Sequence, residues 1–193
     1  MKKFRLAILA SGSGSNAEAL MKWAQTSEYA SVVCVGCNKK EAMVLQRADK
    51  FNVPKFTVLK KKNETKEQYD NRLSEKLDEY RPDWIILAGY MRLLSSEFLK
   101  HYRYQVINIH PSLLPQFPGL DGYGDAFKAK VSESGCTIHY VDEGLDSGKI
   151  IAQEKIALIP GESFESFKAR GLAVENAFYP EVLENLFVKM SKE

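Results

Sequence analysis

The chain has 193 residues, a formal net charge of +2 at pH 7 and a hydrophobic fraction of 45%. These values fit a globular protein with one large domain or two small ones. The charge is too small, and Lys and Arg too scattered, for a nucleic-acid-binding surface. No apolar run approaches the roughly 20 residues of a membrane-spanning helix, and Leu6–Ala10 is too short for a signal-peptide core. We therefore expect a cytoplasmic protein without a nucleic-acid or membrane partner.

Three cysteines are present, Cys34, Cys37 and Cys136. An odd number without a secretion signal indicates reduced thiols. Cys34 and Cys37 form a C-x-x-C pattern, but we place them on or at the end of a strand. Residues three apart in a strand face opposite sides, so packed thiols are favoured over a zinc or redox pair.

Short apolar runs alternate with longer periodic segments through the first half of the chain. The predicted strands are Arg5–Ala10, Ser31–Cys37, Lys55–Leu59, Trp84–Ala88 and Val106–Ile109. The predicted helices between them are Ser15–Gln25, Glu41–Phe51, Thr65–Tyr80 and Ser96–His101. This alternation predicts an α/β fold with a doubly wound, mostly parallel sheet and helices on both faces, in a Rossmann-like arrangement.

The pattern changes after Pro111. Residues 111–125 are rich in Pro and Gly, which predicts loops. A long helix is expected from near Ser163, interrupted or kinked near Pro180. Between them we predict one short helix and two strands that can pair antiparallel: Ala126–Val131, Cys136–Val141 and Lys149–Ala157.

A glycine-rich segment, Ser11-Gly12-Ser13-Gly14-Ser15-Asn16, follows the first strand and opens the first helix. Backbone N–H groups at a helix start face an anion, and the helix dipole favours negative charge there. We predict a phosphate site at Gly14, Ser15 and Asn16, where a Cβ at Gly14 would block close approach. The alternative is a tight turn capped by Ser15 or Asn16.

The same segment also fits G-x-G-x-x-A through Gly12, Gly14 and Ala17, which is the pattern of dinucleotide sites. The acidic residue expected about twenty positions later is replaced by Asn38-Lys39-Lys40. That change removes the usual partner of the NAD ribose, but lysines there would suit the extra phosphate of NADP. A non-enzymatic NADP-binding module therefore stays open as an alternative.

A second candidate site lies at the end of the strand Val106–Ile109. Asn108 and His110 are two residues apart, so their side chains share one face of the strand. Asn108 can donate to a developing oxyanion, and His110 can donate to it or move protons. Asp146, in Leu145-Asp146-Ser147-Gly148, can orient His110 or pass protons through a water. These groups suit transfer of an acyl group to an amine. We interpret His101 and His139 as structural and Ser112 as a turn residue.

At these residues the chain resembles the folate-dependent formyltransferase family. The signature Asn108-Ile109-His110-Pro111-Ser112-Leu113-Leu114-Pro115 and the aspartate Asp146 carry the resemblance. The glycine-rich segment and two further motifs support it over nearly the whole chain: Ala88-Gly89-Tyr90-Met91-Arg92-Leu93-Leu94 and Val174-Glu175-Asn176-Ala177-Phe178-Tyr179-Pro180.

The resemblance implies a formyltransferase domain spanning 1–193, with a phosphate-binding half at about 1–105 and a catalytic and folate-binding half at about 106–193. It implies that the formyl group of 10-formyltetrahydrofolate passes to the glycyl amine of glycinamide ribonucleotide in purine (IMP) synthesis. No metal is implied, and the protein would be a monomer or homodimer.

The resemblance also implies a role for each matching site residue. Catalysis would use Asn108, His110 and Asp146. The ribonucleotide phosphate would lie at Gly14, Ser15 and Asn16, and its ribose at Glu175. The folate-binding residues would be Lys66, Met91, Arg92, Leu93, Leu94, Asn108, Asp142, Glu143, Gly144, Leu145 and Asp146.

The chain departs from the family pattern at Asp121-Gly122-Tyr123-Gly124-Asp125, where several relatives carry histidines and an arginine. The nearest enzymatic alternative is a formyltetrahydrofolate deformylase, in which water replaces the amine. Deformylases usually have an additional N-terminal regulatory domain, and methionyl-tRNA formyltransferases usually have a C-terminal tRNA-binding domain. Because the first strand starts at Arg5 and the chain ends after one helix, we expect neither domain here.

Overall fold

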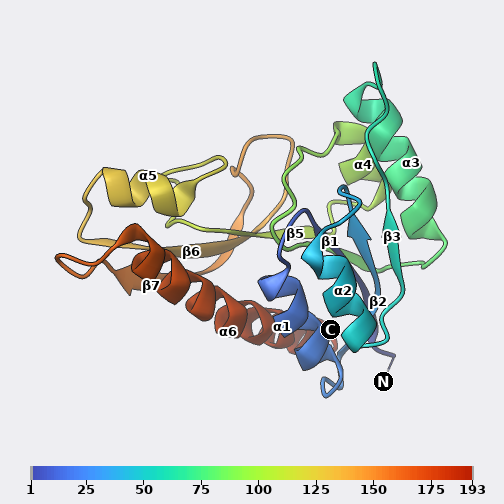
Figure 1. The fold of residues 1–193 in the computed structure, drawn as a ribbon. Coiled ribbons are helices and arrows are strands. Elements are labelled where there is room, and N and C mark those ends of the chain that lie inside the picture. The colour runs from blue at the N-terminus through green and yellow to red at the C-terminus, as the bar shows by residue number, and fades with distance from the viewer. Residues whose placement is uncertain (1, 193) are drawn as a thin grey trace.

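The computed structural model describes residues 2–192, so the two ends of the expected 1–193 domain, residues 1 and 193, lie outside the described residues. The described chain contains seven strands: β1 (Phe4–Ala10), β2 (Ala30–Cys37), β3 (Lys55–Thr57), β4 (Trp84–Leu87), β5 (Val106–His110), β6 (Glu133–Tyr140) and β7 (Ile150–Ala157). They form a sheet in the order β3-β2-β1-β4-β5-β6-β7 (Figure 1). β1 to β5 are parallel, while β6 and β7 are antiparallel to their neighbours.

Helices cover both faces of this sheet, which confirms the predicted α/β architecture. They are α1 (Ser15–Ala24), α2 (Met43–Lys50), α3 (Lys66–Asp78), α4 (Ser96–His101), α5 (Gly122–Lys128) and α6 (Phe164–Met190). One core cluster joins α1, α2 and α6 to one face, and another joins α3 and α4 to the other face. Side chains of β1 alternate between the clusters, as the strand pleat requires: Leu6 and Ile8 enter the first, and Ala7 and Leu9 the second.

The predicted antiparallel pairing of the last two strands is confirmed, but the predicted starts of α5 and β6 are wrong. α5 begins at Gly122 rather than Ala126, because the Asp121 carboxylate accepts a hydrogen bond from Gly124 N at 3.2 Å and caps the helix four residues earlier. β6 begins at Glu133 rather than Cys136, because Glu133 already pairs with Ala157 of β7.

The expected interruption of the last helix is also wrong, since α6 runs unbroken through Pro180. Proline removes its own N–H from the helix ladder and its ring crowds the carbonyl of residue i−4, and burial of the neighbouring residues offsets this cost. Tyr179 is fully buried, and its hydroxyl lies 3.1 Å from the carbonyl oxygens of both Leu87 and Ile107. α6 is thereby held against the ends of β4 and β5.

The cysteines confirm the prediction of packed thiols. All three are buried free thiols within residues 2–192. Cys34 belongs to the core cluster on one face of the sheet and Cys37 to the cluster on the other, so the C-x-x-C pair points in opposite directions. Burial raises the pKa of Cys34 to about 12. Within the described chain, we find no helix with the length and apolar character needed to span a bilayer.

We predict that Phe187→Ala lowers the free energy of unfolding by about 3–5 kcal/mol, the usual range for a buried aromatic side chain. Phe187 is fully buried, and its ring centroid lies 4.9 Å from that of Phe4 and 5.9 Å from that of Trp84. Urea denaturation would measure the loss. Ile159→Ala is the control, because Ile159 is 54% exposed and its truncation should change stability by less than about 0.5 kcal/mol. Equal losses in both variants would contradict the assigned core.

Candidate active site

A cavity of about 700 Å³ lies where the strand order reverses between β1 and β4. Open α/β sheets bind ligands at such a switch point, beyond the carboxyl ends of the strands. Segments following β1, β4 and β5 line the cavity together with parts of α5 and α6. The structure brings all the predicted site residues to this cavity: Gly14, Ser15, Asn16, Lys66, Met91, Arg92, Leu93, Leu94, Asn108, His110, Asp142, Glu143, Gly144, Leu145, Asp146 and Glu175.

The glycine-rich loop enters α1 through Gly14, which has φ 76° and is the N-cap residue. No side chain of the described structure caps this helix start, so the expected alternative of a turn capped by Ser15 or Asn16 is wrong. The expectation for Gly14 also needs correction. A Cβ there would lie 2.5 Å from Val44 Cβ and 2.9 Å from Val44 Cα, so it would strike α2. At Gly12, by contrast, a Cβ meets nothing within 4 Å.

The side chain of Asn16 crosses to α6, where its Nδ2 donates to Glu175 Oε2 at 2.6 Å. Both residues are buried, with exposures of 7% and 4%. Glu175 Oε1 and Asn16 Oδ1 are buried and have no hydrogen-bond partner among residues 2–192. Burial raises the pKa of Glu175, against the opposing effects of Tyr123 and Asn16. These two oxygen atoms therefore lie in the cavity wall, and each can still accept a hydrogen bond.

Asn108 and His139 form a cross-strand pair between β5 and β6. His139 Nδ1 lies 2.9 Å from Tyr140 O, which can only accept, so Nδ1 carries the proton. Its Nε2 then accepts from Asn108 Nδ2 at 3.2 Å. Burial lowers the pKa of His139, which keeps the ring neutral. The amide of Asn108 is therefore held with its second N–H available for another acceptor.

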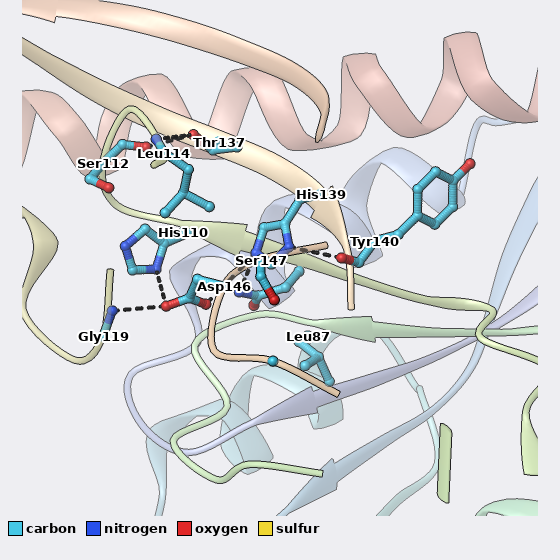
Figure 2. A network of polar contacts seen from close by, with 12 residues as sticks. Leu87, His110, Ser112, Leu114, Gly119, Thr137, His139, Tyr140, Asp146 and Ser147 are labelled. Atoms are coloured by element: carbon cyan, nitrogen blue, oxygen red, sulfur yellow. Dashed lines mark hydrogen bonds and ion pairs between the residues drawn. The ribbon is translucent and has the colours of Figure 1, made fainter. Parts of the chain in front are cut away.

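His110 is 3% exposed, and both of its ring nitrogens face oxygen atoms of the protein. Nε2 lies 2.8 Å from Phe117 O, and Nδ1 lies 3.4 Å from Asp146 Oδ2. The same carboxylate oxygen accepts from Gly119 N at 2.8 Å, so Asp146 bridges His110 and the loop (Figure 2). A backbone carbonyl only accepts, so Nε2 carries a proton. Nδ1 is then the ring nitrogen that remains to take up or release a proton, and it faces Asp146.

Comparison with known proteins decides the family. The model of the family described as "Formyl transferase" matches residues 4–183 of the chain. This chain belongs to the formyl transferase family.

Individual relatives agree with this assignment. The chain is 42% identical to the phosphoribosylglycinamide formyltransferase of Bacillus subtilis (strain 168), over 96% of this chain and 95% of that protein. It is also 42% identical to the trifunctional purine biosynthetic protein adenosine-3 of Drosophila pseudoobscura pseudoobscura, over 93% of this chain but 13% of that longer protein. The crystal structure of glycinamide ribonucleotide transformylase 1 from Geobacillus kaustophilus is 43% identical, with a TM-score of 0.91 and coverage of 96% of this chain and 100% of that chain.

One part of this formyl transferase's cavity is formed by Lys66 and residues 91–94. This part, which we call the apolar arm, carries cations beside apolar side chains. The guanidinium of Arg92 lies 3.9 Å from the centroid of the Tyr69 ring, and Lys66 Nζ lies 3.5 Å from Leu94 O. Arg92 Nε is buried and has no hydrogen-bond partner within the described chain. Met91 is 55% exposed and Leu93 61% exposed, so this arm offers an apolar surface flanked by positive charge.

Tyr123, His139 and Lys168 are among the residues that line the cavity but were not predicted as site residues. Besides its structural place in β6, the His139 ring holds the amide of Asn108. The pairing of Asn108 with His139 depends on strand register, and no short-range pattern records it. Tyr123 and Lys168 approach from α5 and α6, whose docking is equally absent from local sequence. Within residues 2–192, no group of three His, Cys, Asp or Glu side chains is arranged to hold a metal ion.

We predict that Gly14→Val lowers the free energy of unfolding by about 2–5 kcal/mol, since it combines overpacking against Val44 with a left-handed φ. Gly12→Val should change it by less than about 1 kcal/mol, because its side chain enters open space. Thermal and urea unfolding of both variants would measure the difference. Equal stability of the two variants would contradict the described packing of α1 on α2.

Proposed function

We propose that the chain is a phosphoribosylglycinamide formyltransferase, which transfers the formyl group of 10-formyltetrahydrofolate to the glycyl amine of glycinamide ribonucleotide in purine (IMP) synthesis. The observation that carries the proposal is the meeting of Asn108, His110 and Asp146 in one cavity, between an anion-binding loop and an apolar arm with cations. Near-complete coverage of relatives with this name supports it.

The ribonucleotide fits the part of the cavity beside the start of α1. The N–H groups of Gly14, Ser15 and Asn16 stand at a helix start, where a phosphate gains from both hydrogen bonding and the helix dipole. Glu175 Oε1 and Asn16 Oδ1 lack a partner among the described residues, and the hydroxyl groups of a ribose would supply donors to both.

The folate, which would supply the formyl carbon, fits the apolar arm of the cavity. Met91, Leu93 and Leu145 are each more than half exposed and would cover its apolar rings. The chain from Asp142 to Asp146 provides backbone polar groups along one wall of the cavity. Lys66 and Arg92 would meet its carboxylates.

The reacting groups lie between these two parts of the cavity. Asn108 keeps one N–H for an oxygen that gains negative charge, which is the role of an oxyanion-hole donor. The position between His110 Nδ1 and Asp146 Oδ2, which are 3.4 Å apart, would receive the proton that the attacking amine loses. The proton would then pass to N10 of the folate as the bond between N10 and the formyl carbon breaks. Phe117 O and Gly119 N hold these two side chains in place from the loop.

We predict that His110→Ala and Asp146→Asn each reduce turnover by about 10²–10⁴-fold, the usual contribution of a positioned acid–base group. The matched controls are His101→Ala and Asp78→Asn. His101 Nε2 lies 3.0 Å from Asp78 Oδ2 outside the cavity, and both side chains are 49% exposed. These controls should keep wild-type turnover. Near-normal turnover of both His110→Ala and Asp146→Asn, with an unchanged fold, would sink the catalytic assignment.

We predict that Gly12→Val raises the KM for glycinamide ribonucleotide by tenfold or more, while the KM for 10-formyltetrahydrofolate stays within about twofold. Its side chain would enter the space of the anion-binding loop. Steady-state kinetics with each substrate varied in turn would measure both constants. An unchanged ribonucleotide KM would place the phosphate elsewhere.

The function itself is tested by incubating the protein with 10-formyltetrahydrofolate, with and without the ribonucleotide. We expect folate deformylation only with the ribonucleotide present, together with a formylated product. Deformylation without it would indicate the deformylase alternative. NADP binding without any formyl transfer would favour the non-enzymatic alternative.

A further inference from the structure

Three buried polar atoms without a completed hydrogen bond lie on one wall of the cavity. They are Asn16 Oδ1 on α1, Tyr123 Oη on α5 and Glu175 Oε1 on α6, none of which has a partner among residues 2–192. Buried polar groups are nearly always hydrogen-bonded in native proteins. The members of such a cluster need partners, which can come from one another and from a polar ligand in the cavity.

The phenol of Tyr123 is fixed in this wall by packing. The residue is 3% exposed, and its ring meets that of Phe167 edge-on, with centroids 5.4 Å apart and an interplanar angle of 77°. This contact orients the ring, because edge-to-face geometry is preferred by aromatic pairs. The hydroxyl consequently points toward α6 rather than toward solvent.

Gly171 of α6 makes room for that hydroxyl. A Cβ at Gly171 would lie 2.5 Å from Tyr123 Cζ and 2.7 Å from its Oη. Glu175 follows one helical turn later, on the same side of the helix. Glycine within a helix is less favourable than alanine, and here it allows the phenol to approach the carboxylate. The two groups come close enough for each to shift the pKa of the other.

We propose that Tyr123 is a positioning residue, whose hydroxyl donates to the Glu175 carboxylate and holds it to accept hydrogen bonds from the ribose hydroxyls of the substrate. The proposal rests on the function proposed above. A carboxylate has about four acceptor sites. Asn16 Nδ2 occupies one at 2.6 Å and Tyr123 would take a second, which leaves capacity for vicinal hydroxyls.

The charge on Glu175 should respond to this contact. Burial raises its pKa, while Tyr123 lowers it most among its neighbours, followed by Asn16, His110 and Lys168. The Cys136 thiol of β6 also faces it. Since only the carboxylate form accepts from two hydroxyls, the ribonucleotide should bind more weakly as the pH falls through this pKa. Removing the Tyr123 hydroxyl raises the pKa further, so weakening should begin at a higher pH.

Tyr123→Phe tests the proposal, because it keeps the ring against Phe167 and removes only the hydroxyl. We expect the ribonucleotide KM, and its Kd by calorimetry, to rise about tenfold at pH 7.5. The kcat and the folate KM should stay within twofold of wild type. As the pH is lowered, the ribonucleotide KM should begin to rise at a higher pH than in the wild-type protein.

The matched control is Tyr102→Phe, since Tyr102 is another buried tyrosine, 8% exposed, whose hydroxyl donates to Asp78 Oδ1 at 2.9 Å away from the cavity. It should leave both KM values and the pH profile unchanged. If the wild-type protein transfers formyl groups and Tyr123→Phe keeps its ribonucleotide KM and pH profile, the role of Tyr123 is overturned. A parallel change in kcat and both KM values would also overturn it, because that pattern indicates general distortion. Wild-type protein without transferase activity would instead contradict the proposed function.

Discussion

The parallel pairing of β1, β4 and β5 is the constraint on which the rest of this structure depends. Leu9 of β1 is level with Leu87 of β4, which is level with Asn108 of β5. Because parallel strands all end at the same edge, this register brings three chain segments to one height: the glycine-rich loop, the segment after β4 and the Asn108–His110 pair. The reversal of strand order between β1 and β4 then leaves room for a cavity among them.

The long helix α6 joins this edge to the hydrophobic core. Phe187 packs in the core, Tyr179 bonds to the strand carbonyls, Glu175 lines the cavity and Gly171 packs against Tyr123, so one continuous helix carries all four (Figure 1). Burial of the apolar side of α6 determines where Glu175 lies in the cavity wall. That burial also desolvates the carboxylate, and the same packing therefore both positions the acid and raises its pKa.

Polar groups at the site are held mainly by backbone atoms of neighbouring segments. Phe117 O holds His110, Gly119 N holds Asp146, and Tyr140 O sets the tautomer of His139. Backbone partners cannot rotate away as side chains do, so the fold itself holds these three side chains in place. This is the preorganisation that electrostatic stabilisation of a developing charge requires.

The sequence by itself determined the alternation of strands and helices, the glycine-rich loop at the start of α1 and the shared face of Asn108 and His110, because these depend on local periodicity, glycine and strand geometry. It also carried the family motifs. Only the tertiary structure decided the pairing of Asn108 with His139, the contact of Gly14 with Val44 and the approach of Tyr123 to Glu175. Each of these joins residues of different elements, and strand register and helix docking are set by packing of the whole core rather than by any short segment.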